Sequence, residues 1–174
     1  LRAETADFPL EIFFLRVDDI PDYVADGVAH AGIVGENVLA EGLLNLKVAA
    51  KLGFGRCRLS LALPRTSSYS DISDLKNRRI ATSHPCILSK YLNERNIDAE
   101  VHAISGSVEI APSIGLADAV CDIVSSGSTL FSNGLREVET IMRSEAVLIR
   151  GAEIDSNTEE LLDRLLFRIH SVIA

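Results

Sequence analysis

The residues best suited to bind a ligand follow one short apolar run, at residues 119–124. This run, Ala-Val-Cys-Asp-Ile-Val, is followed by five small residues: Ser125, Ser126, Gly127, Ser128 and Thr129. Such a run is typical of a strand covered on both faces. The hydroxyls and successive backbone N–H groups after it can converge on a phosphate, because Gly127 permits a positive φ and Thr129 is placed to cap a following helix. The stretch therefore predicts a buried strand that opens into an anion-binding turn.

Asp122 is the one charged residue inside this run, and burying a carboxylate costs free energy. A carboxylate cannot bind a phosphate directly. It can instead accept hydrogen bonds from the two vicinal hydroxyls of a ribose whose 5-phosphate lies in the turn. The stretch alone leaves a second interpretation open, a capped helix start beside a surface aspartate, since short turns rich in glycine and serine are common.

The composition is that of an ordinary globular chain. Its 174 residues, 47% hydrophobic and 24% charged, suffice for one domain or two small ones. A net charge of −8 argues against a general nucleic-acid surface, which needs clustered Lys and Arg. The three cysteines have neither CxxC nor Cys/His spacing, which argues against a disulfide framework and a zinc site. No apolar run approaches the roughly 20 residues that span a bilayer, so we expect a cytoplasmic protein with neither nucleic acid nor membrane as partner.

Predicted strands and helices alternate along the chain, which indicates an α/β fold with parallel sheets. Strands are expected at residues 10–17, 29–35, after Gly55, within 74–82, and at 101–104, 119–124 and 145–149. Helices are expected at about 20–26, from 36, from 85 and over 158–173. The leucine stripe of the last helix is typical of core packing. The polar, serine-rich stretch at residues 65–73 predicts a loop and, with the chain's length, two lobes with a cleft between them.

The stretch from Asp122 to Leu130 resembles the phosphoribosyl-diphosphate loop of the ATP phosphoribosyltransferase family, which opens histidine biosynthesis. The usual loop is Asp-(Leu/Ile)-Val-x-(Thr/Ser)-Gly-x-Thr-Leu, and this chain has Asp-Ile-Val-Ser-Ser-Gly-Ser-Thr-Leu, with Asn-Gly-Leu from residue 133. Four further blocks agree in the family's order: Leu-Arg-x-x-Asp-Ile-Pro at 15–21, Gly-Ile-Val-Gly at 32–35, Gly-Phe-Gly-x-Cys-Arg-Leu at 53–59 and Gly-Ser-Val-Glu at 106–109. The resemblance thus covers nearly the whole chain.

The resemblance implies site residues in each of these blocks. Asp122 and Glu109 would hold ribose hydroxyls, and residues 125–129 would bind the 5-phosphate. Arg16 would neutralise the leaving diphosphate. Contacts to ATP and to the cleft would come from six residues: Arg16, Asp19, Gly35, Glu36, Cys57 and Arg58.

The residues by themselves leave other interpretations open. Arg16 can pair with Asp18 or Asp19 at a strand end. A carboxylate such as Glu109 is favourable in the first turn of any helix, and Cys57 can simply pack in a core. His30 and His84 stand where the family usually has Leu and Tyr, and we assign catalysis to neither.

The implied enzyme is a pentosyltransferase, in which N1 of the adenine of ATP displaces pyrophosphate from C1 of 5-phosphoribosyl 1-diphosphate. Asp122 and Arg16 would be the catalytic residues, and Mg²⁺ would balance the diphosphate charge through the substrate, without direct protein ligands. A homo-oligomer is expected, either a dimer or a hexamer built from dimers. The competing interpretation is a non-catalytic ligand-binding or regulatory module on the same bilobal fold.

The implied fold is α/β and two-lobed, like type II periplasmic binding proteins, with parallel or mixed sheets flanked by helices. The first lobe would comprise residues 1–63 and 146–174, and the second, residues 64–145, would carry the phosphoribosyl-diphosphate loop. The family's N-terminal strand and Lys-Gly-Arg loop have no counterpart here, and neither has its regulatory domain. We therefore expect a core of the long form of the family, truncated at both ends, that need not be active by itself.

Overall fold

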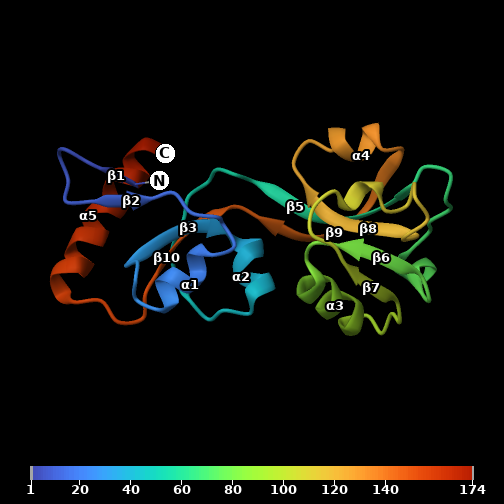
Figure 1. Cartoon of the computed structure of the whole chain (residues 1–174), viewed down its shortest axis with the longest axis horizontal. Coiled ribbons are helices and arrows are strands. Elements are labelled where there is room, and N and C mark those ends of the chain that lie inside the picture. Colours follow the sequence, from blue (N-terminus) through green and yellow to red (C-terminus); the bar gives the residue numbers. More distant parts are fainter. Residues whose placement is uncertain (1, 174) are drawn as a thin grey trace. The chain divides into compact units, whose positions relative to one another are not determined.

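The chain folds into two compact units in the computed structural model, which describes residues 2–173 (Figure 1). Unit 1 contains the residues up to 39, residues 44–53 and those from 146 on, and unit 2 contains residues 40–43 and 54–145. The strand that begins at Cys57 lies in unit 2, whereas we expected the first lobe to reach residue 63. It lies there because it pairs along its length with two other strands of that unit.

Unit 1 is built on a three-stranded antiparallel sheet in the order β3-β10-β4. Its elements are β1 (Arg2–Glu4), β2 (Glu11–Phe13), α1 (Ile20–Ala25), β3 (Ala31–Gly35), the start of α2 (Glu36–Gly42), β4 (Lys47–Lys51), β10 (Ala146–Arg150) and α5 (Ser156–Ile173). Val24 of α1 packs against Val34, Val147 and Ile149 of the sheet. This cluster forms one small core of unit 1.

Unit 2 is built on a five-stranded mixed sheet in the order β7-β6-β8-β5-β9. Its strands are β5 (Cys57–Pro64), β6 (Arg79–Thr82), β7 (Glu100–Ala103), β8 (Ala119–Val124) and β9 (Leu135–Ser144), and its helices are α3 (Pro85–Glu94), α4 (Ser128–Ser132) and the 3₁₀ turns η1 (Ile72–Leu75) and η2 (Val108–Ile110). β6 runs parallel to β7 and β8, while β5 runs antiparallel to β8 and β9.

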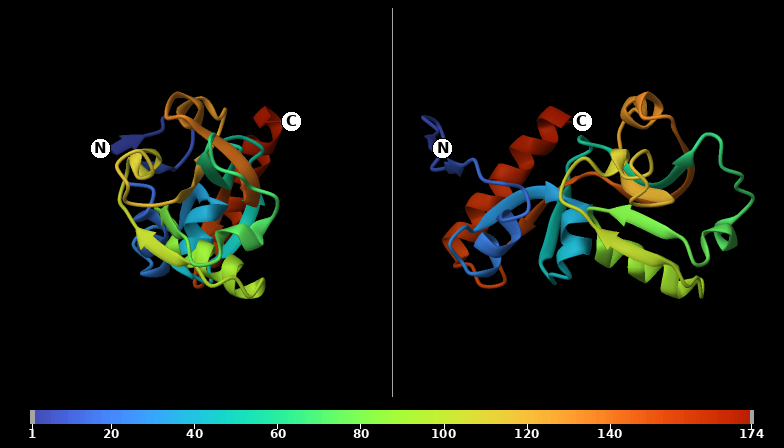
Figure 2. Two further views of the ribbon diagram at one scale, coloured as in Figure 1. Left: turned by 90° about the vertical axis from the view of Figure 1, so that its right-hand side faces the viewer. Right: turned by 45° about the vertical axis from the view of Figure 1, so that its right-hand side comes forward.

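The alternation of side chains along β5 gives this sheet two different faces. Leu59, Leu61 and Leu63 belong to one buried cluster, with residues of α3. Ala62 belongs to another, with residues of η2 and α4. Figures 1 and 2 show α3 and α4 on opposite sides of the sheet. The face with the smaller side chains, beside α4, is the one that carries the candidate site.

Most predicted elements are confirmed, but the strand at residues 10–17 is reduced to β2. This strand pairs only with β1 among the described strands, and its three residues are exposed. Three strands, β1, β4 and β9, were not predicted. β9 alternates poorly because it is rich in charged residues and its pairing with β5 shifts register at two places.

Two helix starts also differ from expectation. Gly127, in the left-handed conformation at φ 83°, occupies the N-cap of α4, so Thr129 lies inside the helix and does not cap it. Ser107 precedes a 3₁₀ turn instead of an α-helix and makes no side-chain capping bond.

In α5, Leu166 and Ile169 pack against the cluster of Leu52, while other leucines of the stripe are half-buried. None of the described helices is long and apolar enough to cross a membrane.

We predict that Leu61→Ala destabilises unit 2 by roughly 2–5 kcal/mol, the usual cost of truncating a buried leucine. Leu61 is 0% exposed and lies in the central strand β5. Urea denaturation of the variant measures the change. Leu116→Ala is the matched control, because Leu116 is 41% exposed; an equal loss in both variants would contradict the placement of this core.

Candidate functional site

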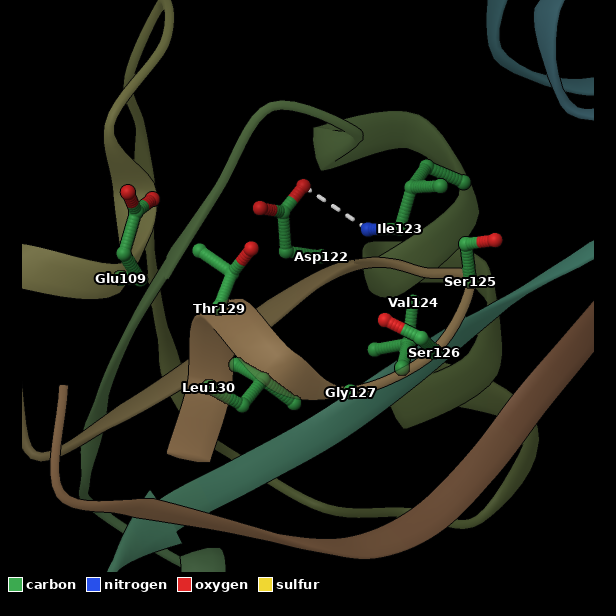
Figure 3. A pocket seen from close by; sticks show the side chains of 9 residues that line it. All are labelled: Glu109, Asp122, Ile123, Val124, Ser125, Ser126, Gly127, Thr129 and Leu130. Atoms are coloured by element: carbon green, nitrogen blue, oxygen red, sulfur yellow. Dashed lines mark hydrogen bonds between the residues drawn. The ribbon is translucent and has the colours of Figure 1, made fainter. Parts of the chain in front are cut away.

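A pocket of about 210 Å³ lies at the carboxyl end of β8, within unit 2 (Figure 3). Nine residues line it: Glu109, Asp122, Ile123, Val124, Ser125, Ser126, Gly127, Thr129 and Leu130. Four of the five predicted turn residues are therefore at the pocket, and Ser128 is not among its lining residues. Most of these residues come together in one concave surface because β8 ends here and the chain turns into α4.

The position of Asp122 follows from the parallel pairing of β6 and β8, which brings their carboxyl ends to the same edge of the sheet. In open α/β sheets this edge is where ligands bind. Asp122 is half-buried, and its Oδ1 accepts hydrogen bonds from the Ile123 amide at 2.8 Å and from Ser83 Oγ at 3.4 Å. Its Oδ2 accepts none from the residues that the structure describes. One carboxylate oxygen is thus left for a ligand.

Burial raises the pKa of Asp122, and the nearby carboxylate of Glu109 raises it further. The Ile123 amide, His84 and Ser83 act in the opposite direction. Figure 3 shows the side chains of Glu109, Asp122 and Thr129 around the same space. Two carboxylates next to a hydroxyl can hold the hydroxyl groups of a sugar, and their mutual repulsion is relieved when a donor or a cation enters.

Most amides of the turn after β8 have no protein acceptor among the residues that the structure describes. For the N–H groups of residues 125–130, the one acceptor recorded in the described chain is Ser126 Oγ, which receives the Ser128 amide at 3.4 Å. The hydroxyls of Ser126 and Ser128 lie 2.9 Å apart. Gly127 permits this turn because its φ of 83° is unfavourable for other residues. A bend of free amides and hydroxyls can bind an anion.

Arg58 supports this turn from the neighbouring strand β5. Its Nε and Nη2 donate to Glu137 at 2.5 and 2.6 Å, and its Nη1 donates to the Ser125 carbonyl at 3.1 Å. Cys57, the preceding residue, is half-buried at the start of β5. Neither residue lines the pocket itself.

The other predicted site residues lie in unit 1. Arg16 is exposed in the turn before α1, and its carbonyl accepts from the amide of Asp19, the N-cap residue of that helix. Gly35 ends β3, and Glu36 opens α2 and pairs with Lys51 at 2.7 Å. Their roles at the site remain predictions.

Sequence reasoning missed Ser83, which joins the site through β6. Its hydroxyl lies 2.9 Å from Nδ1 of His84 as well as 3.4 Å from Asp122. A hydroxyl directly after a predicted parallel strand is the signal that could have found it. Among residues 2–173 there is no cluster of three or more His, Cys, Asp or Glu side chains that could hold a metal ion.

Comparison with known proteins identifies the protein family of this chain. A family model described as "ATP phosphoribosyltransferase" matches residues 16–171. A protein of that name from Cytophaga hutchinsonii is 55% identical over 99% of this chain and 60% of its own length. One from Bacteroides fragilis is 52% identical over 99% of this chain and 61% of its own length. The chain therefore spans about three fifths of these curated relatives.

Solved structures agree with the fold. The ATP phosphoribosyl transferase (HisG:HisZ) complex from Thermotoga maritima contains a chain that matches with a TM-score of 0.82 and 28% identity, over 94% of this chain and 78% of that one. The substrate-binding protein of an amino acid ABC transporter matches with a TM-score of 0.64 and 14% identity, over 94% of this chain and 74% of that one. The α/β fold like that of periplasmic binding proteins is therefore confirmed.

We predict opposite pH effects for two substitutions at the two ends of β8. Asp122 has a raised pKa, so its charged form opposes folding above the unfolded-state pKa. Asp122→Asn should therefore unfold at higher urea concentration than the wild type at pH 7, with an advantage that shrinks as the pH falls below the raised pKa.

Asp118→Asn is the matched control, because hydrogen bonds from Arg79 lower the pKa of Asp118. Its charged form stabilises the fold, and this contribution is lost as the pH falls through the lowered pKa. The variant should therefore be less stable than the wild type at pH 7, with a deficit that shrinks in acid. Two variants of the same sign would contradict the charge environments described.

Proposed function

Because the chain belongs to the ATP phosphoribosyltransferase family, we propose that its pocket binds 5-phosphoribosyl 1-diphosphate for condensation with ATP. The products are N1-(5-phosphoribosyl)-ATP and pyrophosphate, in the first step of histidine biosynthesis. The observation that carries the proposal is the half-buried Asp122 beside a turn of free amides. This combination matches the two ends of a ribose 5-phosphate, a diol and a dianion.

Each group of the substrate has a proposed partner. The free Oδ2 of Asp122, with Glu109 across the pocket, accepts hydrogen bonds from the ribose hydroxyls. The amides and hydroxyls of residues 125–129 donate to the 5-phosphate. Phosphate at this turn leaves C1 of the ribose beyond the carboxylates, open to a second substrate.

The reaction requires no covalent intermediate on the protein. The bond from C1 to the diphosphate oxygen breaks while a bond from C1 to adenine N1 forms, and the electron pair leaves with pyrophosphate. The protein contributes by aligning the two reactants and by neutralising charge on the leaving group. We assign the latter role to Arg16, and contacts with ATP to Asp19, Gly35, Glu36 and Cys57.

Mg²⁺ is the proposed metal, and it fits the residues present only as a substrate-borne ion. The described residues form no three-ligand cluster, whereas the pocket has two carboxylates, Glu109 and Asp122, that can hold its water ligands. When bound, the ion supplies charge neutralisation for the diphosphate.

We further propose that the chain assembles with copies of itself, as a dimer or a hexamer built from dimers, and works in the cytoplasm. The related Thermotoga maritima structure is a complex, so assembly with other chains is known for that relative.

A non-catalytic binding module on this fold is the alternative to the proposed enzyme. The ABC-transporter neighbour shares the fold at 14% identity, which shows the fold alone.

The test measures pyrophosphate release after the chain is mixed with ATP, 5-phosphoribosyl 1-diphosphate and Mg²⁺. We expect release that depends on all three, and a fall of about 100-fold or more in Asp122→Asn, the usual effect of removing a preorganised charged contact. Asp118→Asn, at the other end of β8, should keep its activity at a temperature where it is folded.

Calorimetric titration separates the other outcomes. Binding of 5-phosphoribosyl 1-diphosphate without turnover would support the site while showing that catalysis needs more than these residues. No binding of either substrate would overturn the proposal in favour of the binding module.

A further inference from the structure

Two arginines hold the two ends of β8 in a similar way. Arg58 donates to both carboxylate oxygens of Glu137 and to the Ser125 carbonyl, just after the strand. Arg79 donates to both carboxylate oxygens of Asp118, at 3.4 Å each, and to the Gly115 carbonyl at 3.1 Å, just before the strand. Each arginine therefore ties a carboxylate to a loop carbonyl, but only the first loop lines the pocket.

The register of the sheet explains why Arg58 reaches the turn. Arg58 lies opposite Val124, the last residue of β8. Its partner Glu137 comes from β9, on the other side of β5, and also accepts from Thr140 Oγ1 at 3.3 Å. The hydrogen bond from Arg58 is the main cause of the lowered pKa of Glu137. A bidentate pair of this kind fixes the guanidinium plane as well as its charge.

Fixing the Ser125 carbonyl has a consequence for the next amide. The peptide bond is planar and trans, so the N–H of Ser126 points opposite to the carbonyl that Arg58 holds. That N–H is one of the free amides of the turn. Arg58 thus orients the Ser126 amide before any ligand arrives.

Direct contact of Arg58 with substrate is the competing role, and it is the one that the resemblance to the family implies. The contacts in the structure argue against it. Nε and Nη2 are engaged by Glu137, Nη1 is engaged by Ser125, and the carboxylate already compensates the charge. The Arg58 side chain is 28% exposed and that of Glu137 is 26% exposed. This pair, which we call the clamp, is therefore more buried than the pair of Arg79 and Asp118.

We propose that Arg58 and Glu137 are positioning residues that hold the turn at residues 125–129 in its phosphate-binding shape. The inference rests on the proposed binding of 5-phosphoribosyl 1-diphosphate. Preorganisation of this kind raises affinity because the ligand does not have to order the loop. Glu137 is then as necessary as Arg58, although it has the wrong charge to bind a phosphate.

The test compares Glu137→Gln, Arg58→Lys and Arg79→Lys in titrations with 5-phosphoribosyl 1-diphosphate. We expect Glu137→Gln and Arg58→Lys each to weaken binding at least tenfold, because lysine cannot make the bidentate and carbonyl contacts together. Arg79→Lys should bind like the wild type. If Arg58 served instead as a direct phosphate ligand, Glu137→Gln would leave binding unchanged or tighter, and the inference would be overturned.

NMR order parameters of the amides of residues 125–130, without ligand, keep the clamp testable independently of function. We expect them to fall in Glu137→Gln and Arg58→Lys and to stay unchanged in Arg79→Lys. Wild-type protein that fails to bind the substrate would reject the proposed function, while the order parameters would still decide whether the clamp holds the turn. Unchanged order parameters in all three variants would overturn the clamp. Amide spectra with native dispersion establish that each variant is folded.

Discussion

The partial burial of one carboxylate, that of Asp122, is the constraint on which the site depends. Removing a charge from water costs free energy, and here the cost shows as a raised pKa. The Ile123 amide and the Ser83 hydroxyl offset part of it through one oxygen, and the other oxygen has no partner among residues 2–173. A protein that needed only stability at this position would be better served by a neutral residue. The arrangement suits a carboxylate that accepts hydrogen bonds from the hydroxyl groups of a ligand.

The sheet of unit 2 supplies both the carboxylate and its surroundings. The parallel pair β6 and β8 ends at one edge, which brings Ser83 next to Asp122. The antiparallel strands β5 and β9 then pass the same edge and deliver Arg58 and Glu137 beside the turn. On β5, Ala62 packs in the cluster beside α4, and the odd-numbered leucines build the core on the other face. A mixed sheet thus combines a ligand-binding edge with a rigid support.

The sequence predicted those features that are local. β8, the start of α3, Gly27 as the end of α1 and the turn at residues 125–129 all follow from short runs of residues, and the structure contains them. The strand expected at residues 10–17 is reduced to β2, because alternation of apolar residues does not show whether other elements cover a strand. β9 was not predicted because charged residues such as Glu137 and Glu139 interrupt its apolar residues, and these carboxylates find their partners only once other elements lie beside the strand. Ser83 and Glu137 are 39 and 15 residues away from Asp122 in sequence, so only the strand order brings them to the site.

The most direct test is a crystal structure of the chain with 5-phosphoribosyl 1-diphosphate bound. We expect the ribose hydroxyls within hydrogen-bonding distance of Asp122 and the 5-phosphate on the amides of residues 125–129. A ligand whose phosphate occupies the turn while its sugar points away from Asp122, or one bound elsewhere on the chain, would contradict the claim that the buried carboxylate and the bend together recognise a ribose 5-phosphate.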